Sequence, residues 1–325
     1  MKVVFAILLM IFPLSPAFAW LNSAAFSVCV LDEDGLPVSN AVVRAGFYQS
    51  KSVGRGAGIE LAKRFVKLTD TNGVCSFQGR CNGTVVWGPE KDGYYSTLGI
   101  RVPLNKVSFG RFEPWNLQYE ATLRKIINPV PMYAKRLWDE FIPAYGAPLG
   151  YDLMKGDWLP PHGRGETADF IFQLDCKFGG KRAIDNGQIF ESTFTLTFSN
   201  DGDGIQEADD TQWPGSVFRL PRYAPEDGYA SNWCEKGYEN EQGSSVSSEK
   251  DYFFRVRTKK DDEGRIVSAL YGKIRKSLHA VVVISGSKLR LAYYLNPTPN
   301  DRNMEFDPKR NLLTDLTPFE AVSEP

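Results

Sequence analysis

A strict two-residue alternation of apolar and polar side chains is the feature that most constrains this fold. Within residues 170–178 the alternate positions are Phe170, Phe172, Leu174, Cys176 and Phe178, and residues 190–198 nearly repeat the pattern. Successive side chains of a strand point to opposite faces, so each run predicts a strand with one buried face. The sequence 185–187, Asp-Asn-Gly, is typical of a hairpin turn. The two runs therefore predict an antiparallel pair packed on a hydrophobic core.

Short runs of the same kind recur along the chain, with Gly, Asp and Asn turns between them. A helical pattern is found only at 133–141, in a proline-rich stretch where Trp138 and Phe141 are expected to pack against the domains. A chain of 325 residues is long enough for two domains. We expect an all-β protein with a small β-sandwich at 20–104, a Pro-rich connector at 105–150, and a larger antiparallel sandwich or jelly-roll-like domain at 151–325.

Three turn motifs near the N-terminus resemble a known domain. They are Asp32-x-x-Gly35-x-Pro37-Val38, then Thr69-Asp70-x-Asn72-Gly73, then Lys91-Asp92-Gly93-Tyr94. Together they make residues 25–97 similar to the carboxypeptidase regulatory-like domain, a small transthyretin-like β-sandwich of exported bacterial proteins. The resemblance implies a non-catalytic accessory or spacer module and brings no catalytic residues with it.

The first nineteen residues have the pattern of a secretory signal peptide. Lys2 precedes an apolar run at 3–12, prolines follow, and Ala17-Phe18-Ala19 forms an A-x-A cleavage site. The run is too short for a stable membrane anchor, and the later apolar stretch at 280–284 is only as long as a strand. We expect a mature chain that starts at Trp20, is secreted or periplasmic, and has no membrane span.

Charge and histidine content exclude several functions. Lys and Arg number 38 against 39 Asp and Glu, a formal net charge of −1, which gives no electrostatic basis for general nucleic-acid binding. His162 and His279 are the two histidines, and no CxxC pair accompanies them, so there is no zinc motif. No G-x-S-x-G turn indicates a serine nucleophile.

Five cysteines in an exported chain raise the question of disulfides. Cys75 and Cys81 lie close in sequence around a turn-forming glycine and are one candidate pair. Cys176 and Cys234 are a second, long-range candidate, although Cys176 has the strand parity of a buried thiol. Sequence spacing alone establishes neither bond.

One acidic segment, residues 199–210, has features of a calcium loop. It holds five carboxylates and two glycines, and calcium is bound by several hard oxygen ligands on a tight turn. The ligand candidates are Asp201, Asp203, Glu207 and Asp210. The alternative is a solvated polar loop, because Ser199 stands at position one and Asp210 replaces the usual glutamate. A structural calcium ion is the only cofactor that the sequence suggests.

Two loops rich in Pro and Gly combine aromatic and charged residues. The first, at 156–166, contains Asp157, Trp158, His162 and Arg164; the second runs between Trp213 and Trp233. A tryptophan face can stack on a sugar ring while charged groups form hydrogen bonds with its hydroxyls, so these residues are candidates for binding a saccharide. The alternative is that Trp158 is plugged into the core.

The sequence therefore favours an exported, non-catalytic binding protein for a surface or extracellular glycan. A secreted hydrolase that uses carboxylates of the loops 157–166 and 201–210 is an alternative, and it requires a cleft with two facing carboxylates, one with a raised pKa. A structural or protein-interaction module of the cell envelope is another, and it requires a flat apolar patch. The expected partner is a glycan or an envelope protein.

Overall fold

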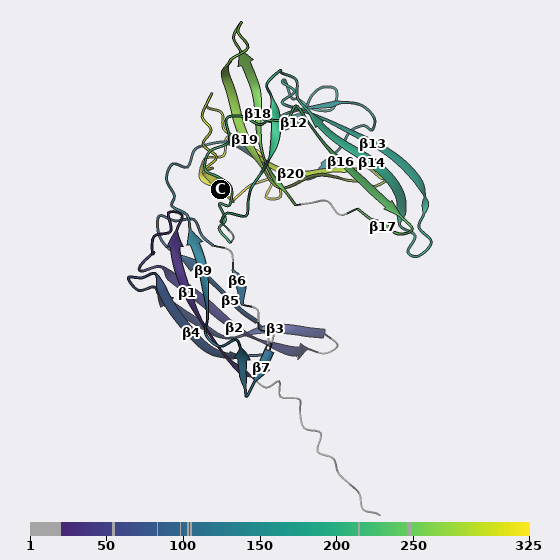
Figure 1. The fold of residues 1–325 in the computed structure, drawn as a ribbon. Helices are drawn as coiled ribbons and strands as arrows, with labels where there is room; N and C mark the ends of the chain where they lie inside the picture. The colour runs from purple at the N-terminus through teal and green to yellow at the C-terminus, as the bar shows by residue number, and fades with distance from the viewer. Residues whose placement is uncertain are drawn as a thin grey trace, which may run out of the picture. The chain divides into compact units, whose positions relative to one another are not determined.

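The computed structural model describes residues 21–325 except 54, 55, 83, 98, 103, 105, 214 and 246–248. The signal-peptide segment and Trp20 lie outside the described residues. Every regular element in the described ranges is a β-strand, apart from one turn of 3-10 helix at Pro308–Arg310 (Figure 1). The all-β prediction is confirmed.

The chain divides into two compact units at Leu123 and Arg124, here called unit 1 and unit 2. Residues 105–150 are therefore split between the units, because β9 (Leu117–Leu123) pairs with β1 (Asn22–Asp32) in unit 1 and β10 (Tyr133–Phe141) belongs to unit 2. The predicted helix at 133–141 is wrong. These residues lie antiparallel to β20 (Lys288–Leu295), and pairing within the sheet outweighs local helix propensity.

Unit 1 consists of two sheets. The first has the order β4 (Val74–Cys81), β1, β8 (Arg111–Glu113), β7 (Lys106–Ser108), with β9 also on β1; the second has the order β3 (Gly56–Leu68), β2 (Val42–Val53), β5 (Thr84–Glu90), β6 (Ile100–Val102). The side chains of β1 alternate between buried and half-buried, as its sequence predicts. Phe26 stacks on Phe77 with ring centroids 5.3 Å apart, at the centre of the unit 1 core.

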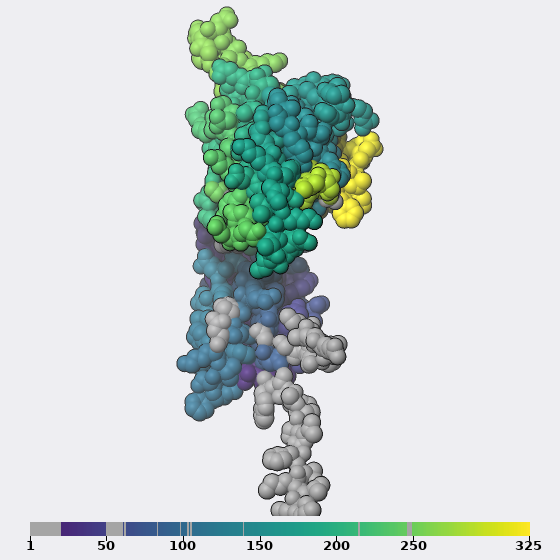
Figure 2. All heavy atoms as spheres, turned by 90° about the vertical axis from the view of Figure 1, so that its right-hand side faces the viewer, coloured from purple at the N-terminus to yellow at the C-terminus, as the bar shows by residue number. Residues whose placement is uncertain are grey.

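Unit 2 also consists of two sheets. The five-stranded sheet has the order β10, β20, β19 (Ile266–Val281), β18 (Asp251–Lys260), β15 (Gly204–Ala208). The six-stranded sheet has the order β12 (Asp157–Trp158), β11 (Leu149–Asp152), β13 (Phe170–Lys181), β14 (Gln188–Thr197), β16 (Asn232–Asn240), β17 (Gly243–Ser244). The tip of the β18–β19 hairpin projects from this unit in both views (Figures 1 and 2).

The predicted pair at 170–198 is present as β13 and β14, and Asn186 in its turn has the positive φ of 63° that this turn chemistry allows. Its apolar faces meet the five-stranded sheet in the core of unit 2. Phe170 and Phe254 are edge to face there, with centroids 4.9 Å apart. The opposite faces of β13 and β14 therefore point away from the core.

Two aromatic side chains of β10 are more exposed than the sequence suggests. Trp138 is 51% exposed and Phe141 is 56% exposed. The guanidinium of Arg290 lies 4.9 Å from the Trp138 ring, and the Lys288 ammonium lies 5.1 Å from the Phe141 ring. Cation–π contacts with the neighbouring strand, instead of burial, hold these rings.

The strand geometry separates both candidate cysteine pairs. Cys75 and Cys81 lie six residues apart on β4, a separation of about 20 Å at about 3.3 Å per residue, whereas a disulfide needs Cα atoms within about 7 Å. Cys176 and Cys234 lie on β13 and β16, with β14 between them. Cys29, Cys75, Cys176 and Cys234 carry free thiols.

Candidate functional site

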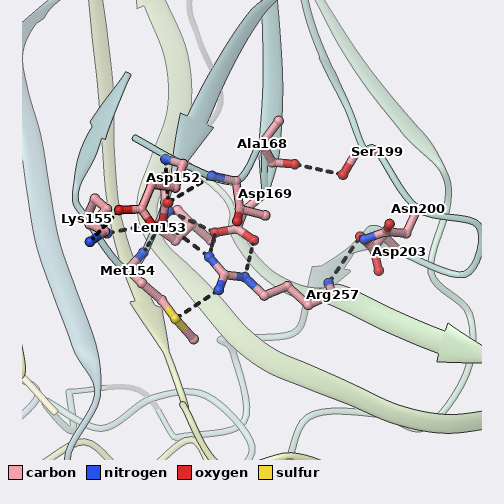
Figure 3. A network of polar contacts seen from close by, with 12 residues as sticks. Asp152, Leu153, Met154, Lys155, Ala168, Asp169, Ser199, Asn200, Asp203 and Arg257 are labelled. Carbon is pink, nitrogen blue, oxygen red and sulfur yellow. Dashed lines mark hydrogen bonds and ion pairs between the residues drawn. The ribbon is translucent and has the colours of Figure 1, made fainter. Parts of the chain in front are cut away.

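The loop that follows β11 is organised by the buried carboxylate of Asp152 (Figure 3). Its Oδ1 accepts hydrogen bonds from the backbone N–H groups of Met154 (2.9 Å) and Lys155 (3.1 Å). Its Oδ2 accepts from those of Glu166 (2.9 Å) and Thr167 (3.0 Å). Burial alone would raise the pKa of Asp152, but these four hydrogen bonds hold it below its ordinary value. The carboxylate therefore fixes both ends of the loop.

Arg257 of β18 ties this loop to the other sheet (Figure 3). Its guanidinium donates to both oxygens of Asp169, at 2.7 Å and 2.9 Å, and to Oδ1 of Asp152 at 3.2 Å. Burial raises the pKa of Asp169, and the arginine opposes that rise. Because these charges are engaged with one another, we assign the cluster a structural role as a clamp between the two sheets.

The four calcium-ligand candidates do not form a ligand set. Asp203 accepts hydrogen bonds from the backbone of Arg257 and Thr258, and Gly204–Ala208 is strand β15 instead of loop. The other three candidates pair separately with basic side chains: Asp201 with Lys260, Glu207 with Lys250, and Asp210 with Arg219. In the described ranges no three His, Cys, Asp or Glu side chains are grouped to hold a metal ion. The local geometry gives the calcium hypothesis no support.

Trp158 is not available to stack on a ligand. It is 3% exposed and packs edge to face on Tyr151, with centroids 5.1 Å apart. Its Nε1 donates a 2.8 Å hydrogen bond to Oε1 of Glu140 on β10. The core alternative is therefore the correct one for this residue. His162, by contrast, is exposed on the loop.

The other two candidate tryptophans also take part in packing. Trp213 lies 3.8 Å from the guanidinium of Arg124. Trp233 packs on Phe194, and its Nε1 donates to the Tyr252 hydroxyl at 3.2 Å. Both rings are half-buried. The tryptophans that the sequence nominated are not gathered at one surface.

Asp157 and Arg164 do lie at a concave site, here called the Glu140 pocket. It has a volume of about 370 Å³ and a strongly polar wall. Its lining residues are Lys135, Glu140, Lys155, Gly156, Asp157, Arg164, Leu312, Leu313, Thr314, Asp315, Leu316 and Glu320. The composition of the loop 156–166 thus identified two lining residues of this pocket, Asp157 and Arg164. The lining residues from β10 and from the C-terminal segment belong to no local sequence motif that could have identified them.

A larger concave site, here called the sheet groove, lies on the six-stranded sheet. Its volume is about 790 Å³, within the usual range for ligand pockets. The lining residues are Tyr145, Gly146, Asp175, Cys176, Lys177, Glu191, Ser192, Thr193, Lys236, Gly237, Tyr238, Asn240, Gln242 and Gly243. They come from β13, β14 and β16, together with the β16–β17 turn and a loop before β11.

The strand register arranges the polar side chains of the groove in two rows. Thr193 lies opposite Asp175 on one side and Lys236 on the other. Two residues further along, Glu191 lies between Lys177 and Tyr238 in the same way. These positions have the parity opposite to buried Phe172 and Leu174, so the rows face away from the core. Each row thus combines one acidic, one basic and one hydroxyl-bearing side chain across the three strands.

Three of the charged groups of the groove are free to contact a ligand, whereas the fourth, Asp175, accepts a 3.0 Å hydrogen bond from Gln173 Nε2. Within the part of the chain that the structure describes, no ion pair engages Lys177, Glu191 or Lys236. Two tyrosines also line the groove, Tyr145 at 40% and Tyr238 at 45% exposure. The Tyr145 hydroxyl is 2.9 Å from Ser287 Oγ, which fixes its ring.

Comparisons with known proteins leave the family open. No family model matches the chain. An uncharacterized MFS-type transporter of Schizosaccharomyces pombe is 27% identical over 126 residues, which cover 38% of this chain and 21% of the transporter. The chain thus spans about a fifth of the length of that curated relative. In the described ranges, no helix has the length and hydropathy needed to cross a bilayer.

Three solved structures with partial similarity are distant from this chain. A 3-chlorocatechol 1,2-dioxygenase from Rhodococcus opacus has a TM-score of 0.24 and 16% identity, over 32% of this chain and 61% of the dioxygenase. A streptococcal ancillary pilin has a TM-score of 0.22 and 9% identity, over 82% of this chain and 58% of the pilin. A protein of Bacteroides uniformis described as a putative carbohydrate binding protein has a TM-score of 0.17 and 11% identity, over 86% of this chain and 98% of that protein. TM-scores this low carry no argument about function.

Proposed function

We propose that the chain is an exported, non-catalytic protein whose unit 2 binds an extracellular saccharide in the sheet groove. One observation carries the proposal: two cross-strand rows of polar side chains, in which Lys177, Glu191 and Lys236 have no ion pair among the described residues, in a groove that two exposed tyrosines also line. Sugar hydroxyls accept hydrogen bonds from ammonium groups and donate them to carboxylates. The tyrosine rings offer apolar surface to the C–H face of a sugar ring.

The scaffold beneath the groove supports this role. The lining side chains stand on paired strands, so little backbone entropy is lost when a ligand binds. The A-x-A pattern of residues 17–19 supports export. The turn motifs at 32–38 and 69–73 support the proposal that unit 1 is a carboxypeptidase regulatory-like accessory module.

The hydrolase alternative has one observation in its favour. The Glu140 pocket holds a carboxyl with a raised pKa, and Asp157 lies in the same pocket. However, both oxygens of Asp157 are taken by backbone N–H groups, those of Trp158 at 2.8 Å and Arg164 at 2.9 Å. A base or nucleophile needs an oxygen directed at the substrate or at water, so binding is the better-supported function.

A glycan array tests the proposal with the chain 20–325, with added calcium and again with EDTA. We expect a saccharide signal that survives EDTA, because the calcium candidates lie outside the groove. The variants Lys236→Ala and Tyr238→Ala should lose the signal. Thr195→Ala is the matched control, since Thr195 is an outward residue of β14 outside the groove lining. Absence of binding to every glycan would contradict the proposal.

A further inference from the structure

The Glu140 pocket is a second concave site, distinct from the sheet groove in all its lining residues. Three segments that are distant in sequence build it: strand β10, the loop after β11, and residues 312–320. The C-terminal segment is held against β10 by the backbone hydrogen bond from Arg136 N–H to Glu320 O, 2.8 Å long. The pocket is therefore formed by the fold of unit 2 and not by one flexible loop.

Lys135 lies in the wall of this pocket, but its ammonium group is already engaged by partners other than Glu140. The residue is 8% exposed, and Nζ donates a 2.8 Å hydrogen bond to the carbonyl oxygen of Gly156. Nζ also forms a 3.1 Å ion pair with Oε1 of Glu320. Its distance to Oε2 of Glu140 is 4.0 Å, too long for a hydrogen bond.

Glu140 is consequently left with one unoccupied oxygen. Oε1 accepts the indole hydrogen bond of Trp158, whereas Oε2 has no hydrogen-bond partner among the described residues. Burial raises the pKa of Glu140. The charge of Lys135 and the Trp158 hydrogen bond oppose this rise, and the charges of Asp157 and Glu320 add to it. The carboxyl therefore lies where a further positive charge would be stabilised.

The remaining charges leave the pocket with an excess of carboxylates. Lys155 is paired with Glu166, which lies outside the lining, at 2.9 Å. Arg164 approaches Asp157 at 3.6 Å, but its side chain is 95% exposed and screened by solvent. Asp315 has no ion pair among the described residues. Asp315 thus has no cation partner among the described residues, and the one ion pair of Glu140 there is the 4.0 Å contact with Lys135.

We propose that the Glu140 pocket binds a small ligand that carries a primary ammonium group, with the ammonium donating to Oε2 of Glu140. Three N–H donors suit an acidic pocket with more than one available carboxylate. The volume of about 370 Å³ accommodates a ligand of the size of an amino sugar or a short diamine. Leu312 and Leu313 provide apolar contact for its carbon skeleton.

Isothermal titration of the chain 20–325 tests this site with three amine probes: glucosamine, ethanolamine and 1,5-diaminopentane. N-Acetylglucosamine is the neutral counterpart of the first. We expect at least one amine to bind and the N-acetyl sugar not to compete with it. Glu140→Gln should weaken amine binding at least tenfold, and Asp315→Asn, an exposed change that leaves the fold intact, should weaken it severalfold.

Glu191→Gln is the control, because it removes a carboxylate from the sheet groove only. It should leave amine binding unchanged, so a failure of this site is distinguishable from a failure of the groove. Binding of none of the three amines would overturn the proposal. Equal amine affinity of the wild-type chain and a folded Glu140→Gln variant would overturn it as well.

Discussion

The indole Nε1 of Trp158 donates a 2.8 Å hydrogen bond to Oε1 of Glu140. This contact joins β12, at the edge of one sheet of unit 2, to β10, at the edge of the other. A residue that the sequence nominated for stacking on a ligand thereby positions the carboxylate of a pocket. The indole is satisfied internally, as buried tryptophans usually are.

Glu140→Gln should change the pH dependence of stability. The pKa of Glu140 is raised above its ordinary value of 4.5 in the folded chain, so folding takes up a proton. The stability contribution of this group is therefore present at low pH and is lost as pH rises through the folded pKa. The glutamine variant should gain stability relative to the wild type as pH rises from about 4.5 through the folded pKa of Glu140.

Chemical denaturation at a series of pH values measures this difference. Glu191→Gln, a change at an exposed groove position, serves as the control. A constant difference between Glu140→Gln and the wild type across the range would contradict the raised pKa.

Asp152→Asn should destabilise unit 2 strongly. The change turns one carboxylate oxygen into an amide donor, so backbone N–H groups that now donate to Asp152 lose their acceptor, and each unsatisfied buried group costs about 1–3 kcal/mol. Asp209→Asn is the control, because Asp209 is exposed and its side chain bonds to nearby Thr211 alone among the described residues, so we expect a loss below about 1 kcal/mol. Equal unfolding free energies for the two variants would show that the cluster is not a clamp.

Gly272→Ala should disturb the core of unit 2. A Cβ at Gly272 would lie 2.1 Å from Cζ of Phe254 and 2.4 Å from the carbonyl oxygen of Tyr294. Overpacking of this kind costs about 1–3 kcal/mol or more. At Gly180 a Cβ meets nothing within 4 Å, so Gly180→Ala should have little effect. Thermal unfolding of the two variants measures the contrast, and a tolerated alanine at 272 would refute this packing.

Cysteine reactivity should follow exposure. Cys234 is exposed and should react first with iodoacetamide, without prior reduction. Cys75 is buried, which raises its pKa to about 11, so it should react only on unfolding. Peptide mapping over time gives the order. A Cys75–Cys81 or Cys176–Cys234 disulfide in the native protein would contradict the strand register.

Much of the fold was accessible from sequence because alternation and turn chemistry are local signals. The pattern of Phe170, Phe172 and Leu174 predicted a half-buried strand, and Asn186 predicted its turn, and both are confirmed. The assignment at 133–141 failed because β10 is stabilised by pairing with β20, a contact more than a hundred residues away. Local propensity carries no information about such a partner.

The candidate sites were less accessible, because each depends on register. The alternation of apolar and polar residues predicts that Phe172 points inward and Asp175 points outward. It does not predict that Asp175 is aligned with Thr193 and Lys236 across three strands. Likewise, the composition of the loop 156–166 predicts Asp157 and Arg164 as site residues. It does not predict Glu140, which lines the same pocket from another strand. The composition of a loop can indicate that a site is present, but the other residues that line the site come from segments that only the tertiary fold brings together.

The most direct test of the account is the affinity of the chain 20–325 for a saccharide that binds on the array. Calorimetry should compare the wild type with Tyr238→Ala and with Tyr223→Ala, a tyrosine 58% exposed outside the groove. We predict at least a tenfold loss for Tyr238→Ala and no change for Tyr223→Ala. Equal affinity of all three proteins would contradict saccharide binding in the sheet groove.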